Sequence, residues 1–172
     1  MPYAPRTNRD RQPAIPMQPA IDPAAWTPDE LAAKDDWIYE LTGDECDQIV
    51  AAVHGVGKSG TDIKDIRKDD FRLAGFADDL AGIRDEFLNG RGFVLIRGVP
   101  VADMTREQSA IAFWGIGAHL GRAVSQNGQG HLLGHVKDVG GDYSDKNTRG
   151  YLSNAQMGFH ADRCDYVALL CL

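Results

Sequence analysis

Two side chains near the end of the sequence have the types and spacing of metal ligands. The segment Phe159-His160-Ala161-Asp162 places an imidazole and a carboxylate two residues apart. Side chains two apart on a strand point to the same face, so we expect His160 and Asp162 to project together from one strand face or from the end of a strand. They would supply two ligands of a 2-His-1-carboxylate facial triad, the open site typical of non-haem Fe(II) oxygenases. The spacing therefore predicts a metal held by both residues, with their polar atoms within roughly 3–5 Å of each other.

Other residues compete for the same role, because an H-x-D tripeptide alone arises often by chance and then usually lies in a surface loop. His131 and His135 share a face in either a strand or a helix, so they form an alternative metal pair. Cys164 lies close to the proposed ligands, and we expect it to pack rather than to bind metal. His119 lies beside the apolar stripe of a predicted helix, where we expect a hydrogen-bonded core or boundary histidine.

The elements that must position these residues follow from apolar periodicity and capping signals. Helices are predicted near residues 28–34, 43–54, 76–89 and 105–120. Three of them open on a capping box, in which a threonine is followed three residues later by Glu or Gln: Thr27 with Glu30, Thr42 with Glu45, and Thr105 with Gln108. Strands are predicted at 37–41, at 93–96 and at 167–172. The apolar runs 93–96 and 167–172 predict strands buried in the core.

A glycine-rich segment at residues 54–60 is similar to a phosphate-binding loop but departs from it. Ala52 stands where that motif needs its first glycine, and a predicted helix precedes the segment instead of a strand. We interpret the segment as the end of a helix followed by a loop. His54 is then a solvated residue of the last helical turn.

Several motifs in order resemble one known family. Residues 90–100, with the sequence GRGFVLIRGVP, look like the strand that opens the core of taurine dioxygenase-like (TauD/TfdA) proteins. Residues 113–122 look like the helix and turn that follow it in that family. Phe159-His160-Ala161-Asp162 matches the family's iron motif, with Ala161 where Thr or Ser is commoner. The resemblance covers about residues 70–172.

The resemblance implies a fold, cofactors and site residues. The fold would be α+β, an incomplete double-stranded β-helix (a jelly-roll of the clavaminate synthase-like kind) with flanking N-terminal helices and mostly antiparallel strands. The cofactors would be Fe(II), 2-oxoglutarate as co-substrate and O2, with His160 and Asp162 as iron ligands. Asn127 and Gln156 fall roughly where family members place substrate-side residues, and amides that bond to backbone at a strand edge are the alternative. Tyr151, Asn154 and Gln156 are candidates, by proximity, for orienting the two ligands.

The family's second histidine and its 2-oxoglutarate-binding arginine lie well downstream of the H-x-D motif. This sequence has no histidine after His160 and ends about ten residues after Asp162. We therefore expect the N-terminal portion of a longer catalytic domain, inactive alone. We expect the chain to divide into a flexible Pro-rich tail at residues 1–22 and the N-terminal portion of the domain at residues 23–172.

The charge, hydrophobicity and cysteine content limit which kinds of partner and which cellular compartment we expect. A formal net charge of -7 and a pI of about 5.1 argue against a nucleic-acid surface and an anionic membrane surface. No apolar run approaches the roughly 18 residues of a membrane helix. Three cysteines without C-x-x-C spacing favour reduced thiols and a cytoplasmic location. We expect a small-molecule substrate, and a homo-oligomer through an exposed strand edge.

Three functions remain open from the sequence. The first is Fe(II)- and 2-oxoglutarate-dependent hydroxylation of a small organic substrate by a longer domain. The second is a non-catalytic remnant or interaction module of the same fold. The third is a cupin-like metal-binding protein in which His131 or His135 is an additional ligand.

Overall fold

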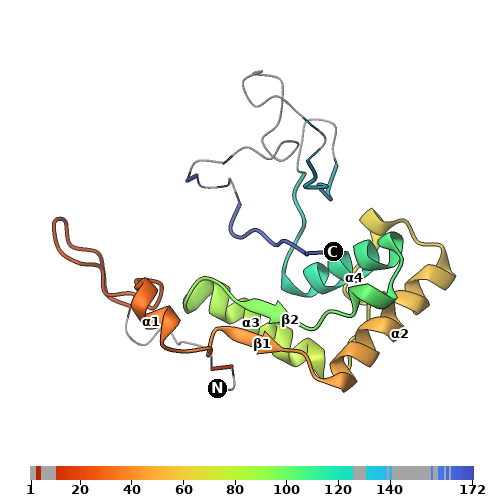
Figure 1. The fold of residues 1–172 in the computed structure, drawn as a ribbon, viewed down its shortest axis with the longest axis horizontal. Helices are drawn as coiled ribbons and strands as arrows, with labels where there is room; N and C mark the ends of the chain where they lie inside the picture. Colours follow the sequence, from red (N-terminus) through yellow and green to blue (C-terminus); the bar gives the residue numbers. More distant parts are fainter. Residues whose placement is uncertain are drawn as a thin grey trace. The chain divides into compact units, whose positions relative to one another are not determined.

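The computed structural model describes residues 3–4, 11–125, 131–138, 140, 156, 159–160, 162 and 164–172. The chain divides into two compact units, one of Met1–Arg122 with Leu170–Leu172 and the other of Ala123–Leu169. In the described residues, every helix and strand belongs to the first unit (Figure 1). No helix among the described residues is long and apolar enough to cross a membrane. The predicted division into residues 1–22 and 23–172 stays a prediction.

Three of the four helices described in the first unit begin at the predicted capping boxes. The four helices are α1 (Pro28–Ala32), α2 (Gly43–Ser59), α3 (Phe76–Asn89) and α4 (Arg106–Leu120), with short 3-10 turns η2 (Ile63–Asp65) and η3 (Val101–Asp103). In α1, α2 and α4 the threonine side chain accepts from the third helical N–H, and the Glu or Gln side chain accepts from the threonine N–H. The three predicted capping boxes are thus confirmed.

Helix α2 extends farther than predicted. It continues through the glycine-rich segment to Ser59 and ends at Gly60, which has a φ of 68° in the left-handed region. Val56 is buried and continues the stripe of Ile49, Ala52 and Val53 on the inner face. Burial of this stripe outweighs the poor helix propensity of Gly55 and Gly57. His54 is exposed as predicted, but it lies within the helix rather than in its last turn.

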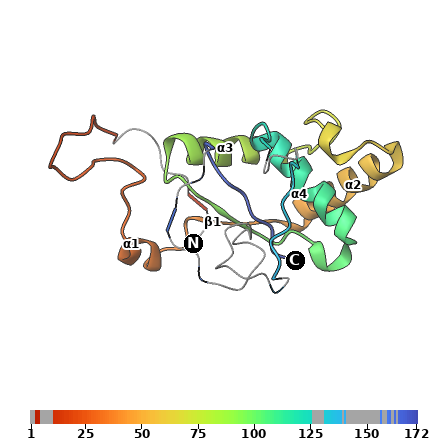
Figure 2. The same ribbon diagram turned by 90° about the horizontal axis from the view of Figure 1, so that it is seen from above.

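The core of the first unit is helical. Helix α4 packs against both α2 and α3, and α2 and α4 lie side by side in two views (Figures 1 and 2). The Phe71 ring lies directly on Gly115 of α4, where an added Cβ would stand 2.3 Å from the ring. The largest apolar side chains that are completely buried come from both neighbouring helices and the loop between them: Ile49, Phe71, Phe76, Leu80 and Ile83.

Two short strands form a parallel pair, which corrects the predicted antiparallel arrangement. Strand β1 (Ile38–Glu40) pairs with β2 (Leu95–Arg97), with Ile38 opposite Leu95. Helices α2 and α3 connect the two strands, and a long helical crossover of this kind returns the chain in the same direction. Helix α3 lies over one face of the pair (Figures 1 and 2). The Phe76 ring at its start lies 6.1 Å from the Tyr39 ring of β1.

Residues 93–96 are not buried on both faces as predicted. Leu95 is 39% exposed. Arg97 is exposed and its Nη1 lies 3.1 Å from Glu40 Oε1 across the strand pair. Phe93 precedes the strand and packs against the Trp26 and Trp37 rings at 5.2 and 5.6 Å. A sheet face is buried only where another element packs on it, and the face of β2 that carries Leu95 and Arg97 is exposed, which explains the error.

The predicted buried strand at residues 167–172 is also wrong. No strand is assigned there, and Val167, Leu169 and Leu172 are exposed. A β-prone run needs a partner strand to satisfy its backbone, and neither β1 nor β2 pairs with this one.

Candidate metal centre

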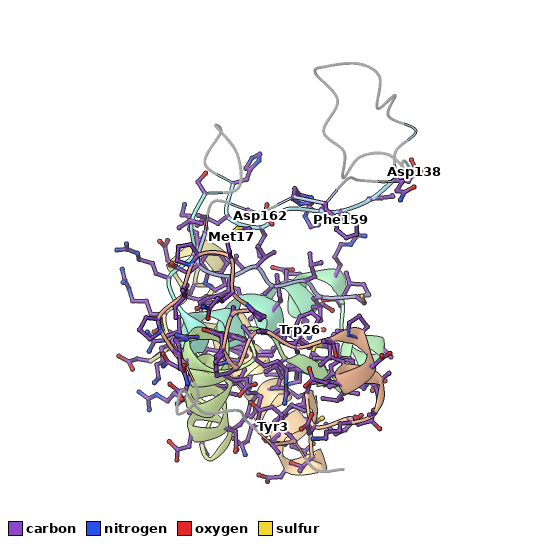
Figure 3. The ribbon with its side chains drawn as sticks, turned by 90° about the vertical axis from the view of Figure 1, so that its left-hand side faces the viewer. Tyr3, Met17, Trp26, Asp138, Phe159 and Asp162 are labelled. Carbon is purple, nitrogen blue, oxygen red and sulfur yellow. The ribbon has the colours of Figure 1, made fainter. Side chains whose placement is uncertain are left out.

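His160 and Asp162 lie close together in the second unit. His160 Nε2 is 4.0 Å from Asp162 Oδ1, and the two side chains are 53% and 55% exposed. No strand or helix is assigned at either residue, and Phe159 beside them is fully exposed (Figure 3). The separation falls within the interval of roughly 3–5 Å that the H-x-D spacing predicts. The predicted placement of both residues on a strand is not found, since no strand is assigned at His160 or Asp162.

The donor atoms of this pair fit a divalent iron ion. An imidazole nitrogen and a carboxylate oxygen are two of the donors in the facial sites of non-haem iron proteins. Two atoms bound at about 2.0–2.2 Å from one metal lie no more than about 4.4 Å apart, taking the distances for zinc as a guide. The 4.0 Å between His160 Nε2 and Asp162 Oδ1 lies below this limit, so both residues could hold one metal ion.

A third ligand is not found among the described residues. In that part of the chain, no three His, Cys, Asp or Glu side chains gather closely enough to hold a metal ion. His131 and His135 are both exposed. Cys164 is exposed with a free thiol, so the predicted packing role for it finds no support. The described part of the chain thus contains the His160–Asp162 pair and no complete centre.

The predicted substrate-side residues are only partly described. Gln156 is exposed. Asn127 lies outside the described residues, as do Tyr151 and Asn154. Their predicted roles stay predictions.

The other prominent histidine has a structural partner, as predicted. His119 Nε2 lies 2.7 Å from the carbonyl oxygen of Phe71. A carbonyl can only accept, so Nε2 carries the proton and donates. Trp114 Nε1, one turn earlier on α4, donates to the Ile66 carbonyl at 3.0 Å. His119 and Trp114 therefore hold residues 66–71 on α4, and the buried His119 Nδ1 has no hydrogen-bond partner among the described residues.

The sequence did not reveal that Arg91 is fully buried. Its side chain has no exposed surface and pairs with Asp36 at 3.2 Å and with Glu86 at 3.7 Å. Asp36 precedes β1 and Glu86 lies in α3, so no motif around Arg91 in the sequence indicated that these two residues are its partners. A guanidinium held in this way is not available to bind a 2-oxoglutarate carboxylate.

Two hollows of about 460 and 360 Å³ lie between α2 and α4. Gly57, Glu107 and Ile111 line both hollows. They belong to the first unit and contain neither His160 nor Asp162. They are therefore distinct from the candidate metal centre.

Comparison with known proteins places the chain in a family. The family described as "Taurine catabolism dioxygenase TauD, TfdA family" matches residues 58–172, which is more than half of the chain. An FR-33289 synthase of Streptomyces rubellomurinus is 29% identical over 156 residues, covering 90% of this chain and 46% of the relative. A taurine hydroxylase-like protein of Stachybotrys chartarum is 23% identical over 158 residues, covering 88% of this chain and 41% of the relative. The chain spans less than half the length of these curated relatives. It belongs to the TauD/TfdA dioxygenase family.

Proposed function

We propose that the protein carrying this chain is an Fe(II)- and 2-oxoglutarate-dependent dioxygenase that hydroxylates a small organic substrate. His160 and Asp162 would be two of its iron ligands. The observation that carries the proposal is the 4.0 Å approach of His160 Nε2 to Asp162 Oδ1 inside the segment that matches the family. The name of one relative, a taurine hydroxylase-like protein, supports an oxidative reaction, and the name of the other, a synthase, supports an enzyme.

The chain's own residues would bind and orient the metal. His160 presents a ring nitrogen lone pair only when that nitrogen is unprotonated, and Asp162 contributes a negative charge that offsets part of the charge of Fe(II). When bound, the iron would bring together 2-oxoglutarate, O2 and substrate, so that one oxygen atom enters the substrate and the other enters succinate with loss of CO2. The exposure of both side chains leaves their ligand atoms accessible to the metal.

The proposal extends to fold and partners. The family implies a jelly-roll, and completing it would require strands in addition to β1 and β2. We propose a small-molecule substrate, no nucleic-acid or membrane partner, and a cytoplasmic location in which the free thiols of Cys46, Cys164 and Cys171 stay reduced. Association of two copies through an exposed strand edge is part of the same proposal.

Succinate production tests the proposed reaction. The protein carrying this chain is incubated with Fe(II), ascorbate, 2-oxoglutarate and a substrate panel that includes taurine. We expect succinate formation that depends on substrate and is lost in Asp162→Ala. The control His54→Ala, which changes an exposed residue of α2, should keep full activity. Tight iron binding without succinate formation for any substrate would favour a non-catalytic metal-binding role.

A further inference from the structure

A buried cluster of charges joins three separate segments of the first unit. The Arg91 guanidinium donates from Nη1 to the Asp36 carbonyl at 3.3 Å and from Nη2 to Asp36 Oδ1 at 3.2 Å. Glu86 Oε1 lies 3.7 Å from Arg91 Nη1, and neither side chain has exposed surface. Loss of one partner from an ion pair buried this completely strongly destabilises a protein, because it leaves an uncompensated buried charge. Whatever holds Arg91, Asp36 and Glu86 together is therefore part of the stability of the first unit.

The same cluster fixes the junction between α3 and β2. Glu86 accepts from the Gly90 and Gly92 amides through its carbonyl, both at 3.1 Å, and from the Arg91 amide through Oε1 at 3.1 Å. Gly92 has a φ of 89°, which favours glycine and lets the chain turn toward β2. Trp26 Nε1 donates to the Arg91 carbonyl at 3.1 Å. The path of the chain into β2 thus depends on Glu86 and Arg91.

Residues 3 and 4 contact this cluster from far away in the sequence. The Ala4 amide donates at 3.0 Å to the Asp36 carbonyl, the oxygen that also accepts from Arg91. The Tyr3 ring packs edge-on against the Tyr39 ring of β1 at 5.3 Å, and its hydroxyl is buried (Figure 3 labels Tyr3). Burial and then the negative charge of Glu86 raise the pKa of Tyr3 to about 12, so the phenol is neutral at physiological pH.

We propose that residues 3 and 4 act as a strap: Tyr3 and Ala4 seat on Asp36 and Tyr39, cover the Arg91–Glu86 ion pair, and lock the junction between α3 and β2. The surface that receives the strap combines an aromatic ring with a backbone carbonyl, which suits an aromatic residue followed by a free N–H. Release of the strap removes the Ala4 hydrogen bond from the Asp36 carbonyl and the Tyr3 packing on Tyr39, so that Asp36 holds Arg91 less firmly and the junction loosens.

Hydrogen exchange measured by mass spectrometry tests the strap in the complete protein. Tyr3→Ser removes the ring and the phenol, and Ile15→Ser is the matched control because Ile15 is an exposed apolar residue of the same N-terminal region. We expect Tyr3→Ser to speed exchange in the peptide over residues 87–95 at least about 5-fold and to lower Tm by about 3–6 °C. Ile15→Ser should change neither. Wild-type exchange at residues 87–95 in Tyr3→Ser would overturn the proposal.

A second variant keeps the test decisive if Tyr3→Ser does not fold. Ala4→Pro removes the N–H that bonds to the Asp36 carbonyl and fixes φ at this position, while it leaves the Tyr3 side chain in place. We expect it to speed exchange at residues 87–95 by about 2- to 5-fold, with no change in a peptide over α4. Equal acceleration in both peptides would indicate general destabilisation and would contradict a strap that acts on the junction.

Discussion

At the residue scale, the H-x-D spacing predicted the distance between two side chains that are neighbours in the sequence. His160 Nε2 lies 4.0 Å from Asp162 Oδ1, and two residues of separation already limit how far apart these atoms can be. The burial of Arg91 was not predictable in this way. Its partners Asp36 and Glu86 lie 55 and 5 residues away, before β1 and inside α3. A lone arginine between two glycines gives no signal of such partners.

Glu45 provides a test of a single buried carboxylate. It accepts from the Tyr39 hydroxyl at 2.5 Å, from the Thr42 amide at 2.6 Å and from the Thr42 hydroxyl at 2.7 Å. Burial acts to raise the pKa of Glu45, but the hydrogen bonds from Tyr39 and Thr42 outweigh it and leave the pKa below its ordinary value of 4.5. Glu45→Ala should lower the free energy of unfolding by about 1–3 kcal/mol, measured by urea denaturation at pH 7.

The lowered pKa of Glu45 also fixes the sign of a pH effect. A carboxyl group with a lower pKa in the folded protein stabilises it above the unfolded value of 4.5, and this contribution is lost as the pH falls through the folded value. Between pH 7 and pH 3, Tm should therefore fall more steeply in the wild type than in Glu45→Gln. Parallel Tm curves for the two proteins would show that Glu45 does not make this contribution.

At the element scale, helix starts were predictable and strand direction was not. A capping box lies within four residues, as at Thr42 and Glu45, so the sequence contains the whole signal. The direction of β2 depends on the crossover through α2 and α3, and the burial of Leu95 depends on which elements cover the sheet. Residues 93–96 alone determine neither the direction of β2 nor the burial of Leu95. The end of α2 was missed because burial of Val56 outweighed the local preference of its glycines.

Two glycines in helices should respond in opposite ways to the same substitution. Gly57 in α2 has nothing within 4 Å of an added Cβ, whereas at Gly115 in α4 that atom would stand 2.3 Å from the Phe71 ring. Gly57→Ala should stabilise the protein by about 0.5–1 kcal/mol, because alanine loses less backbone entropy in a helix. Gly115→Ala should destabilise it by about 1–3 kcal/mol through overpacking. Urea denaturation of both variants measures this, and a stabilised Gly115→Ala would contradict the described packing.

At the scale of the whole molecule, the family could be recognised from the order of its motifs, while the arrangement of the sheet could not. Residues 90–100, 113–122 and 159–162 each carry a local pattern, and together they fall within the matched residues 58–172. The strands of a jelly-roll pair across long sequence separations, so their neighbours are set by the complete chain rather than by any one run.

The exposed apolar side chains near residue 172 predict self-association of the 172-residue chain. Val167, Leu169 and Leu172 are 56%, 79% and 72% exposed. Large apolar side chains exposed to water favour association. Sedimentation velocity of this chain should therefore show mass that rises with concentration, and Val167→Ser with Leu169→Ser should reduce it. An unchanged distribution in the double variant would exclude this segment as the contact.

Iron binding tests the central claim most directly, because it does not depend on the substrate. Anaerobic equilibrium dialysis of the complete protein with Fe(II) should yield about one bound iron per chain. His160→Ala and Asp162→Ala should each weaken binding at least about 100-fold, since loss of groups that only orient a ligand already costs about 10- to 100-fold. The control His54→Ala, which removes an exposed histidine of α2, should bind iron like the wild type. Wild-type affinity in either His160→Ala or Asp162→Ala would contradict the assignment of these residues as iron ligands.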